Sequence, residues 1–367
     1  MLEAQAMGVE LSKDERPFVR PYLAGGMRAY FAKMSDELLD HVRSFKSVRY
    51  VERNLRFQLN LEKGQQLNNL HFEESTDTVH SSTCTASNTD LWGLKRITVT
   101  QLPLPTEYIY DATGGEGVHV FVLDTGIKAT LPAFGGRVYF GADFVNTPAL
   151  RNDPSGHGTH VAGTIMSTPF GVAKKAFAVD VRVIDANNRC TVDAVLSGLN
   201  YALQYRQKKN VINLSLSLGT KVQSIVDAVA AAVRNGIHVV SAAGNDAVDA
   251  CLMSPADAPD GITVAASDQN DLTYVATNYG TCVSIFAPGV DIVSVSKTGG
   301  SVSMTGTSMA APHVSGVIAV LLGSSASTIS PAVMKNDLIG KSSRNMLTPS
   351  RNMPNTRNRL LYNSCSG

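Results

Sequence analysis

Short apolar runs alternate with helical patterns from about Gly117 onward. Four such runs are typical of buried strands, and they lie in residues 117–126, 177–185, 210–217 and 236–245. Between the last two, apolar residues recur on one face of a predicted helix over 221–236, and Gly236 is placed to cap its end. This alternation favours an α/β fold with a mostly parallel, twisted sheet and helices on both faces.

The first 80 or so residues have a different pattern, with many charged and long side chains. A short amphipathic helix is predicted over 36–45, with Ser35 as its N-cap, and a strand is predicted over 47–61. Residues 73–90 are polar and without periodicity, which indicates an exposed linker. The pattern predicts a small α+β module tied to a larger body.

Composition narrows the classes of function. The chain has 367 residues, 44% of them hydrophobic and 17% charged, and a formal net charge of +1. It can therefore bury a substantial core, and its charge points to neither nucleic acid nor a membrane surface. The longest uninterrupted apolar stretch, near 317–322, is too short to span a bilayer. No secretory signal opens the sequence, so either the protein stays in the cell or its true start is missing.

Three polar residues stand at predicted element boundaries of the larger body. Asp124 closes the first strand, and His157 lies between two glycines at the predicted start of a helix. Ser308 opens an apolar helix over 308–322. Each alone has an ordinary structural explanation, as a cap or a packed side chain. Ligands of parallel sheets bind at the carboxyl ends of the strands, however, where such residues would meet.

Together the three residues indicate nucleophilic catalysis. A serine hydroxyl needs a histidine to take its proton, and the histidine needs a carboxylate to fix its tautomer. Asn245, at the end of the fourth strand, could donate to the oxyanion of a tetrahedral intermediate.

The blocks "VFVLDTGI", "SGHGTHVAGTI", "SAAGN" and "MTGTSMAAPHVSG" resemble the signature blocks of the subtilisin-like serine proteases. The resemblance runs from about 92 to 362 and is greatest to the proteinase K and aqualysin branch. It implies a serine endopeptidase that needs no cofactor for its chemistry. Asp124 would orient the imidazole of His157, which would act as the general base. Ser308 would form the acyl-enzyme, and Asn245 would bind the oxyanion. A catalytically silent binding protein on the same fold is the alternative.

Residues 29–60 resemble the second half of the inhibitory prodomain of such proteases. The resemblance implies a prodomain remnant and processing linker over 1–84, ordered at about 25–62, and a peptidase domain over 85–367. Cleavage is expected between residues 80 and 88, giving a mature start close to Thr85. The first strand and helix of such prodomains have no counterpart in residues 1–25, which suggests a truncated start. We therefore expect a secreted, monomeric zymogen that acts on proteins or peptides and is inhibited by its own prodomain.

Five cysteines occur, at 84, 190, 251, 282 and 365. In aqualysin-like relatives the positions of Cys251 and Cys282 are joined by a disulfide, which would fit an oxidising compartment. Cys190 falls in the edge strand that pairs with the bound peptide, where a thiol could make the enzyme sensitive to mercurials or be inert. Cys84 and Cys365 receive no assigned partner.

The resemblance also bears on calcium and on substrate. The carbonyls of Pro259 and Gly261 would contribute to a calcium site, but Ser284 stands where relatives carry an aspartate, so no metal is predicted there. The residues expected to bind substrate are Asn188, Cys190, Ser215, Leu216, Ser217, Ala242, Ala243 and Gly244. Ser217 and its neighbour Leu218 replace glycines of relatives and would narrow the pocket, and Ser254-Pro255 is expected to be a cis peptide.

Overall fold

The computed structural model describes residues 19–59, 65–67, 78–79, 83–145, 152–205 and 207–365. Residues 1–18, the greater part of the segment 1–25 in which no prodomain strand or helix was predicted, and residues 80–82 of the expected cleavage window lie outside this part of the chain.

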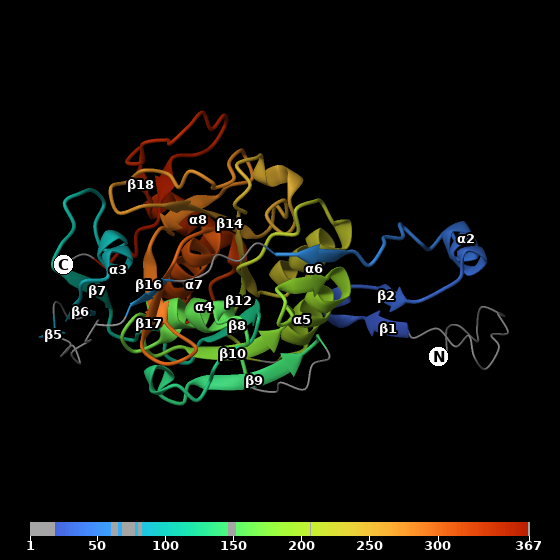
Figure 1. Cartoon of the computed structure of the whole chain (residues 1–367), viewed down its shortest axis with the longest axis horizontal. Helices are drawn as coiled ribbons and strands as arrows, with labels where there is room; N and C mark the ends of the chain where they lie inside the picture. The colour runs from blue at the N-terminus through green and yellow to red at the C-terminus, as the bar shows by residue number, and fades with distance from the viewer. Residues whose placement is uncertain are drawn as a thin grey trace.

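A nine-stranded sheet forms the centre of the molecule (Figure 1), and all its neighbouring strands are parallel except the short pair β18–β19 at one edge. In spatial order the strands are β18 (Ser343–Arg344), β19 (Arg359–Leu360), β15 (Ile285–Pro288), β14 (Ile262–Ser267), β13 (His238–Ala242), β12 (Asn210–Leu214), β8 (His119–Asp124), β10 (Phe177–Arg182) and β9 (Val138–Asp143). The four runs predicted to be buried strands are β8, β10, β12 and β13, so the α/β prediction is confirmed.

Helices cover both faces of the sheet, as the alternating side chains of β8 illustrate. Val120 and Val122 lie in the core shared with α4 and α7, whereas Phe121 and Leu123 lie in the core shared with α5 and α6. The helices are α2 (Asp36–Ser44), α3 (Trp92–Arg96), α4 (His157–Met166), α5 (Val192–Gln204), α6 (Gln223–Arg234), α7 (Thr307–Ser324) and α8 (Pro331–Lys341). Three short 3-10 turns complete them: η1 (Ala24–Gly26), η2 (Pro132–Phe134) and η3 (Ala250–Leu252).

Helix α7 is the central helix of the body. By length and hydropathy it could cross a membrane, yet 83% of its 18 residues are buried inside the protein. It packs on strands β12 to β15 and on α4. Its apolar character is therefore that of a core helix, and its first turn is held at the edge of the sheet.

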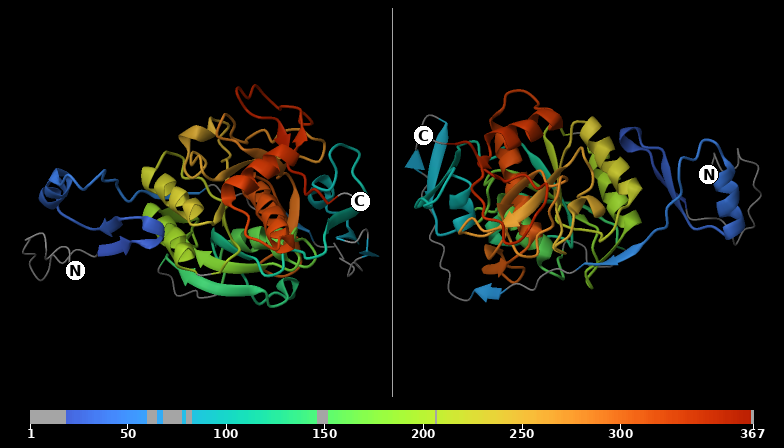
Figure 2. Two further views of the ribbon diagram at one scale, coloured as in Figure 1. Left: turned by 180° about the vertical axis from the view of Figure 1, so that it is seen from behind. Right: turned by 90° about the horizontal axis from the view of Figure 1, so that it is seen from above.

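The N-terminal module reaches out from the body (Figure 2). Strands β1 (Val19–Tyr22) and β2 (Ala29–Ala32) form an antiparallel hairpin that rests on α5. Helix α2 begins as predicted, because Ser35 accepts a hydrogen bond from the backbone N–H of Leu38. None of the residues of α2 is buried.

The strand predicted over 47–61 is much shorter than expected. Of its described residues only β3 (Arg56–Gln58) pairs with another strand, the short β11 (Arg189–Thr191). A strand needs a free edge to pair with, and β11 offers three residues. The apolar alternation of the segment thus reflects its contact with β11 and not a position inside a larger sheet.

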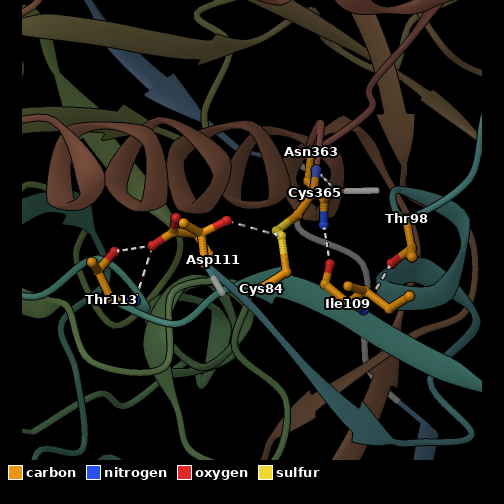
Figure 3. Close-up of a disulfide and its surroundings, with 8 residues drawn as sticks. Cys84, Thr98, Ile109, Asp111, Thr113, Asn363 and Cys365 are labelled. Atoms are coloured by element: carbon orange, nitrogen blue, oxygen red, sulfur yellow. Dashed lines mark hydrogen bonds between the residues drawn. A yellow bond between two sulfur atoms is a disulfide. The ribbon is translucent and has the colours of Figure 1, made fainter. Parts of the chain in front are cut away.

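The prediction of an exposed linker over 73–90 is wrong for its second half. Strand β6 (Cys84–Asn88) is the middle of a three-stranded antiparallel sheet with β5 (Thr78–Val79) and β7 (Glu107–Asp111), and four of its five residues are buried. Cys84 forms a disulfide with Cys365 (Figure 3). The partner lies 281 residues away in sequence, which a local pattern cannot reveal.

Two other strands form a small sheet with a segment of the N-terminal region. Strands β16 (Ile292–Val295) and β17 (Ser301–Met304) pair as a hairpin, and β4 (Gln65–Leu67) adds to the free edge of β17. Strand β17 leads directly into the turn before α7. The N-terminal region therefore pairs with two strands of the body, with β11 through β3 and with β17 through β4.

Candidate active site

Asp124 and His157 form a buried pair. Asp124 is the last residue of β8, and His157 is the first residue of α4. His157 Nδ1 lies 2.8 Å from Asp124 Oδ1, and the same oxygen accepts a hydrogen bond from the N–H of Thr125. Gly156 before the histidine has φ 94°, a conformation that favours glycine. The short spacing confirms that the two sequence candidates meet at the end of β8.

The carboxylate controls the charge of the histidine. Burial alone lowers the pKa of His157, but the charge and hydrogen bond of Asp124, together with the charge of Asp153, raise it above its ordinary value. An imidazole held by a carboxylate at Nδ1 keeps Nε2 available to take a proton. The pair is therefore suited to act as a general base and its orienter.

Asp153 organises the turn that carries His157, and sequence reasoning missed it. Its side chain is buried and accepts hydrogen bonds from the N–H groups of Ser155, Gly156 and Thr159. It also accepts from the hydroxyls of Thr125 and Thr159, at 2.8 and 2.7 Å. An acidic residue just before a helix start is the signal that could have identified this cap.

Ser308 occupies the first turn of α7 at the same edge of the sheet. Gly306 before it has φ 143°, again a glycine conformation. Within the described residues the Ser308 hydroxyl donates to the carbonyl of Ser215 (3.1 Å) and not to His157. In return, Ser215 Oγ donates to the carbonyl of Ser308 (2.8 Å), and this pair fixes the position of the turn.

Asn245 is anchored by its carbonyl oxygen. Its Oδ1 accepts from the N–H of Thr307 at 2.9 Å and from the hydroxyl of Thr307 at 3.0 Å. These two contacts fix the amide, and within the described residues its nitrogen, which lies beside Gly306, is left as a donor without an acceptor. Thr307, which sequence reasoning did not single out, thus orients the amide next to Ser308.

A pocket opens beside the Ser308 hydroxyl. The body residues that line it are Leu216, Ser217, Leu218, Gly219, Ala242, Gly244, Asn245, Asp246, Thr307 and Ser308. The remaining lining comes from the N-terminal region, residues 56–59. Of the residues predicted to bind substrate, Leu216, Ser217, Ala242 and Gly244 therefore line the pocket directly.

The other predicted substrate residues lie around this pocket. The carbonyl of Asn188 accepts from the N–H of Leu59 (2.8 Å), and Cys190 pairs with Phe57 in the β11–β3 ladder. Ser215 lies behind Ser308, as described above. Ala243 is fully buried, and its side chain packs in a separate apolar cluster behind the pocket wall.

Cys190 is free and buried. Burial raises the pKa of its thiol to about 12, with a smaller contribution from the charge of Asp185. The thiol is therefore protonated at neutral pH, and its strand position is covered by β3. Of the two possibilities left open by the sequence, inertness fits this covered state.

The remaining histidines of the signature blocks pack in the core. His160 Nε2 lies 2.8 Å from the carbonyl of Ile292, and burial lowers the pKa of this histidine to about 3. His313 Nδ1 lies 2.8 Å from the carbonyl of Met309, and burial lowers its pKa to about 4. Both are buried packing residues.

Two further expectations are met outside the pocket. Cys251 and Cys282 form a disulfide, and Ser254-Pro255 is a cis peptide. Among the described residues no group of three or more histidine, cysteine or acidic side chains is placed to hold a metal ion.

Comparison with known proteins gives one consistent result. A model of the subtilase family matches residues 115–359 of the chain. Subtilisin-like protease 7 of Arthroderma gypseum is 37% identical over 302 residues, which are 81% of this chain and 69% of that protein. The subtilisin-like serine protease Pen ch 13 of Penicillium rubens is 37% identical over 304 residues, 81% of this chain and 70% of that protein.

A bacterial relative and a solved structure extend the comparison. Alkaline serine exoprotease A of Vibrio alginolyticus is 35% identical over 333 residues, which are 91% of this chain and 58% of that protein. The crystal structure of a cold adapted subtilisin-like serine proteinase superimposes with a TM-score of 0.71 at 38% identity, covering 75% of this chain and 99% of that chain.

Proposed function

The chain belongs to the subtilase family and is a serine endopeptidase, and we propose that Ser308 is its nucleophile and that it is made as a self-cleaving zymogen. The observation that carries the proposal is the Asp124–His157 pair at the end of β8, together with Ser308 in the first turn of α7, beside a pocket that the chain's own residues 56–59 also line. Nothing in the comparisons favours the catalytically silent alternative.

The proposed chemistry follows from this arrangement. Ser308 Oγ leaves the carbonyl of Ser215 by rotation about χ1 and attacks the substrate carbonyl carbon, while its proton passes to Nε2 of His157. Asp124 stabilises the imidazolium through Nδ1–H. The amide nitrogen of Asn245 and the N-terminal N–H groups of α7 bind the negative oxygen that develops.

Collapse of this intermediate gives an acyl-enzyme. The proton on His157 goes to the leaving amine, and the bond between the carbonyl carbon and the amine nitrogen breaks. A water molecule then attacks the ester carbonyl, losing its proton to His157, and Ser308 regains that proton as the acid product leaves. No cofactor takes part in these steps.

The self-cleaving step is supported by the path of the chain. Strand β3 runs antiparallel to β11, and Leu59 reaches the pocket that Ser308 lines. The chain is next described at β4, where Gln65 lies opposite Ser303, five residues before Ser308. We therefore propose that the first cleavage falls between Leu59 and Gln65, in residues that lie outside the described ranges.

The cleavage expected between residues 80 and 88 stays a prediction, and we propose that it follows the first cut as a trimming step. In the present state Thr85 lies inside β6 and is paired with Tyr110 of β7. The Cys84–Cys365 disulfide would retain any fragment that ends at Cys84. A first cut at the earlier position avoids both obstacles.

Protein sequencing tests this proposal directly. The full chain should convert to a shorter form with a new N-terminus between residues 60 and 65, should react at Ser308 with a phosphonylating reagent, and should hydrolyse peptides. Ser308→Ala should remain intact and unlabelled, whereas Ser324→Ala, an exposed serine of the same helix, should process normally. A mature, peptide-hydrolysing Ser308→Ala variant would contradict the assigned nucleophile, and a first cut only at 80–88 would contradict the proposed position.

The cellular compartment, the oligomeric state and the partners of the enzyme are also proposed. The two disulfides Cys84–Cys365 and Cys251–Cys282 favour an oxidising, extracellular compartment. The net charge of +1 gives no reason to expect nucleic acid or a membrane as partner. We propose a monomeric enzyme that acts on proteins or peptides and is inhibited at first by its own N-terminal module.

A further inference from the structure

The side chain of Lys335 fills a cation position between α8 and the start of β14. Its Nζ donates to the carbonyl oxygens of Pro259 (2.8 Å) and Gly261 (2.6 Å). Two backbone carbonyls that converge on one point form the kind of arrangement that holds a hard cation such as calcium. Here the converging oxygens already have an ammonium group as their partner.

These two carbonyls are the ones that the family resemblance assigned to calcium, and the remaining residues do not fit that ion. Ser284 stands in place of the carboxylate, and its Oγ accepts a hydrogen bond from the N–H of Thr263 (3.2 Å). A hydroxyl used in this way adds no negative charge to the site. A divalent ion would also have to displace the ammonium of Lys335, with which it shares both carbonyls.

The surroundings of Lys335 suit a resident single charge. Burial lowers the pKa of Lys335, whereas the nearby carboxylate of Asp260 favours the charged form. An ammonium group offers three donors, and two of them are used by the carbonyls. The ammonium group thus supplies a single positive charge to the two carbonyls, and no ion from solution is needed there.

The turn held by Lys335 follows one wall of the specificity pocket. Ser254 accepts from the N–H of Leu218, a pocket residue, and its own N–H donates to Thr220. The chain then runs through residues 256–261 into β14, which pairs with β13. A tether at Pro259 and Gly261 therefore fixes the far end of this wall segment.

We propose that Lys335 is a built-in cation that takes the place of calcium at Pro259 and Gly261, so that this turn is held without any dependence on calcium. The inference concerns folding and does not rest on the assigned nucleophile. It is tested on the full chain carrying Ser308→Ala, which keeps the protein intact during measurement.

Thermal unfolding, followed in EDTA and in millimolar calcium, gives the readout. Lys335→Met should lower Tm by on the order of 5 °C in both solutions, because the carbonyls of exposed Pro259 and buried Gly261 both lose a charged donor. Lys175→Met is the matched control, since Lys175 donates to one carbonyl, that of Ala112, at an exposed site. It should change Tm by less than about 2 °C.

A second variant tests whether Lys335 takes the place of a calcium ion. Ser284→Asp combined with Lys335→Ala restores a carboxylate and vacates the carbonyls, so calcium should raise its Tm by several degrees, about 3 °C or more. The Ser308→Ala parent should respond by less than about 1 °C. Three results would each overturn the proposal. The parent could lose as much stability in EDTA as the combined variant, Lys335→Met could be as stable as the parent, or the Tm of the combined variant could be unaffected by calcium.

Discussion

Cys190 of β11 lies directly opposite Phe57 of β3 in the antiparallel ladder between the body and its N-terminal module. We expect an extended substrate to use the backbone groups of β11 that β3 occupies here. Phe57 also packs against the apolar cluster that contains Cys190, so we expect the exposure of the thiol to report on the departure of β3.

Thiol labelling tests this relationship. In the Ser308→Ala chain, Cys190 should react with a mercurial about tenfold more slowly, or slower still, than in the processed enzyme, because β3 shields the thiol and burial keeps it protonated. Reaction is measured by mass spectrometry, and Cys190→Ser supplies the blank. Equal rates in the two forms would mean that β3 does not protect the strand.

Glu52 should hold the N-terminal module on the body. Its carboxylate accepts from the N–H groups of Gln223 (2.7 Å) and Ser224 (2.9 Å), at the start of α6. Losing such a helix cap costs about 1 kcal/mol, so in Glu52→Ala activity should appear about fivefold sooner after the first cut. The exposed Glu37→Ala is the control, and a time course of peptide hydrolysis is the measurement. An unchanged delay would remove Glu52 from the docking contact.

Asp153 should tune the pH dependence of catalysis. Besides Asp124 and Asp153, the titratable group that faces His157 is His160, which burial keeps neutral near pH 7. Activity falls as pH drops through the raised pKa of His157. In Asp153→Asn one negative charge is lost, the imidazolium is less favoured, and this acid limb should move to lower pH.

The measurement is kcat/KM against pH. Asp337→Asn, a change at an exposed helix residue, should leave the acid limb in place. If Asp153→Asn lowers the rate at every pH without moving the limb, then Asp153 supports the turn but does not influence the charge of His157.

Ser217 should narrow the specificity pocket. Its buried hydroxyl has no hydrogen-bond partner within the described residues, and it lies 3.1 Å from where a Cβ on Gly244 would stand. Ser217→Gly should raise kcat/KM for phenylalanine before the cleaved bond, relative to alanine, by about tenfold. Ser217→Ala keeps the Cβ and should change the ratio far less. If Ser217→Gly leaves the ratio of the two kcat/KM values unchanged, a residue other than Ser217 limits the size of the side chain that the pocket accepts.

A buried ion pair should dominate the stability of the region before β7. Arg96 is fully buried, and its Nε and Nη2 reach the two carboxylate oxygens of Asp271 at 2.6 and 3.0 Å. Asp271→Ala leaves an unpaired buried charge and should lower the free energy of unfolding by about 3–5 kcal/mol. Chemical denaturation in the Ser308→Ala background measures it, with exposed Asp291→Ala as control. A loss below about 1 kcal/mol would show that Arg96 finds water instead.

Much of the fold and of the central pair could be predicted because the signals are local. Apolar strand runs and small residues lie next to Asp124, His157 and Ser308 in sequence, and the parallel sheet brings strand ends together. The meeting of Asp124 with His157 was inferred in this way, although 33 residues separate them.

What escaped prediction depends on contacts between distant and unremarkable residues. The polar strand β6 becomes buried only because it pairs with β7 and its first residue bonds to Cys365. Lys335 looks like any surface helix lysine until the fold brings two carbonyls to its end. Propensity and periodicity carry no information about such partners.

The disulfide between Cys84 and Cys365 has a consequence for an enzyme that shares its solution with active copies of itself. It joins the first residue of β6 to the last described residue of the chain, so residues 84–365 form a closed covalent ring. The two ends of the ring are therefore held together, and the residues before Cys84 stay outside it. A single cut inside the ring by another copy of the enzyme would leave one covalently connected molecule instead of two fragments.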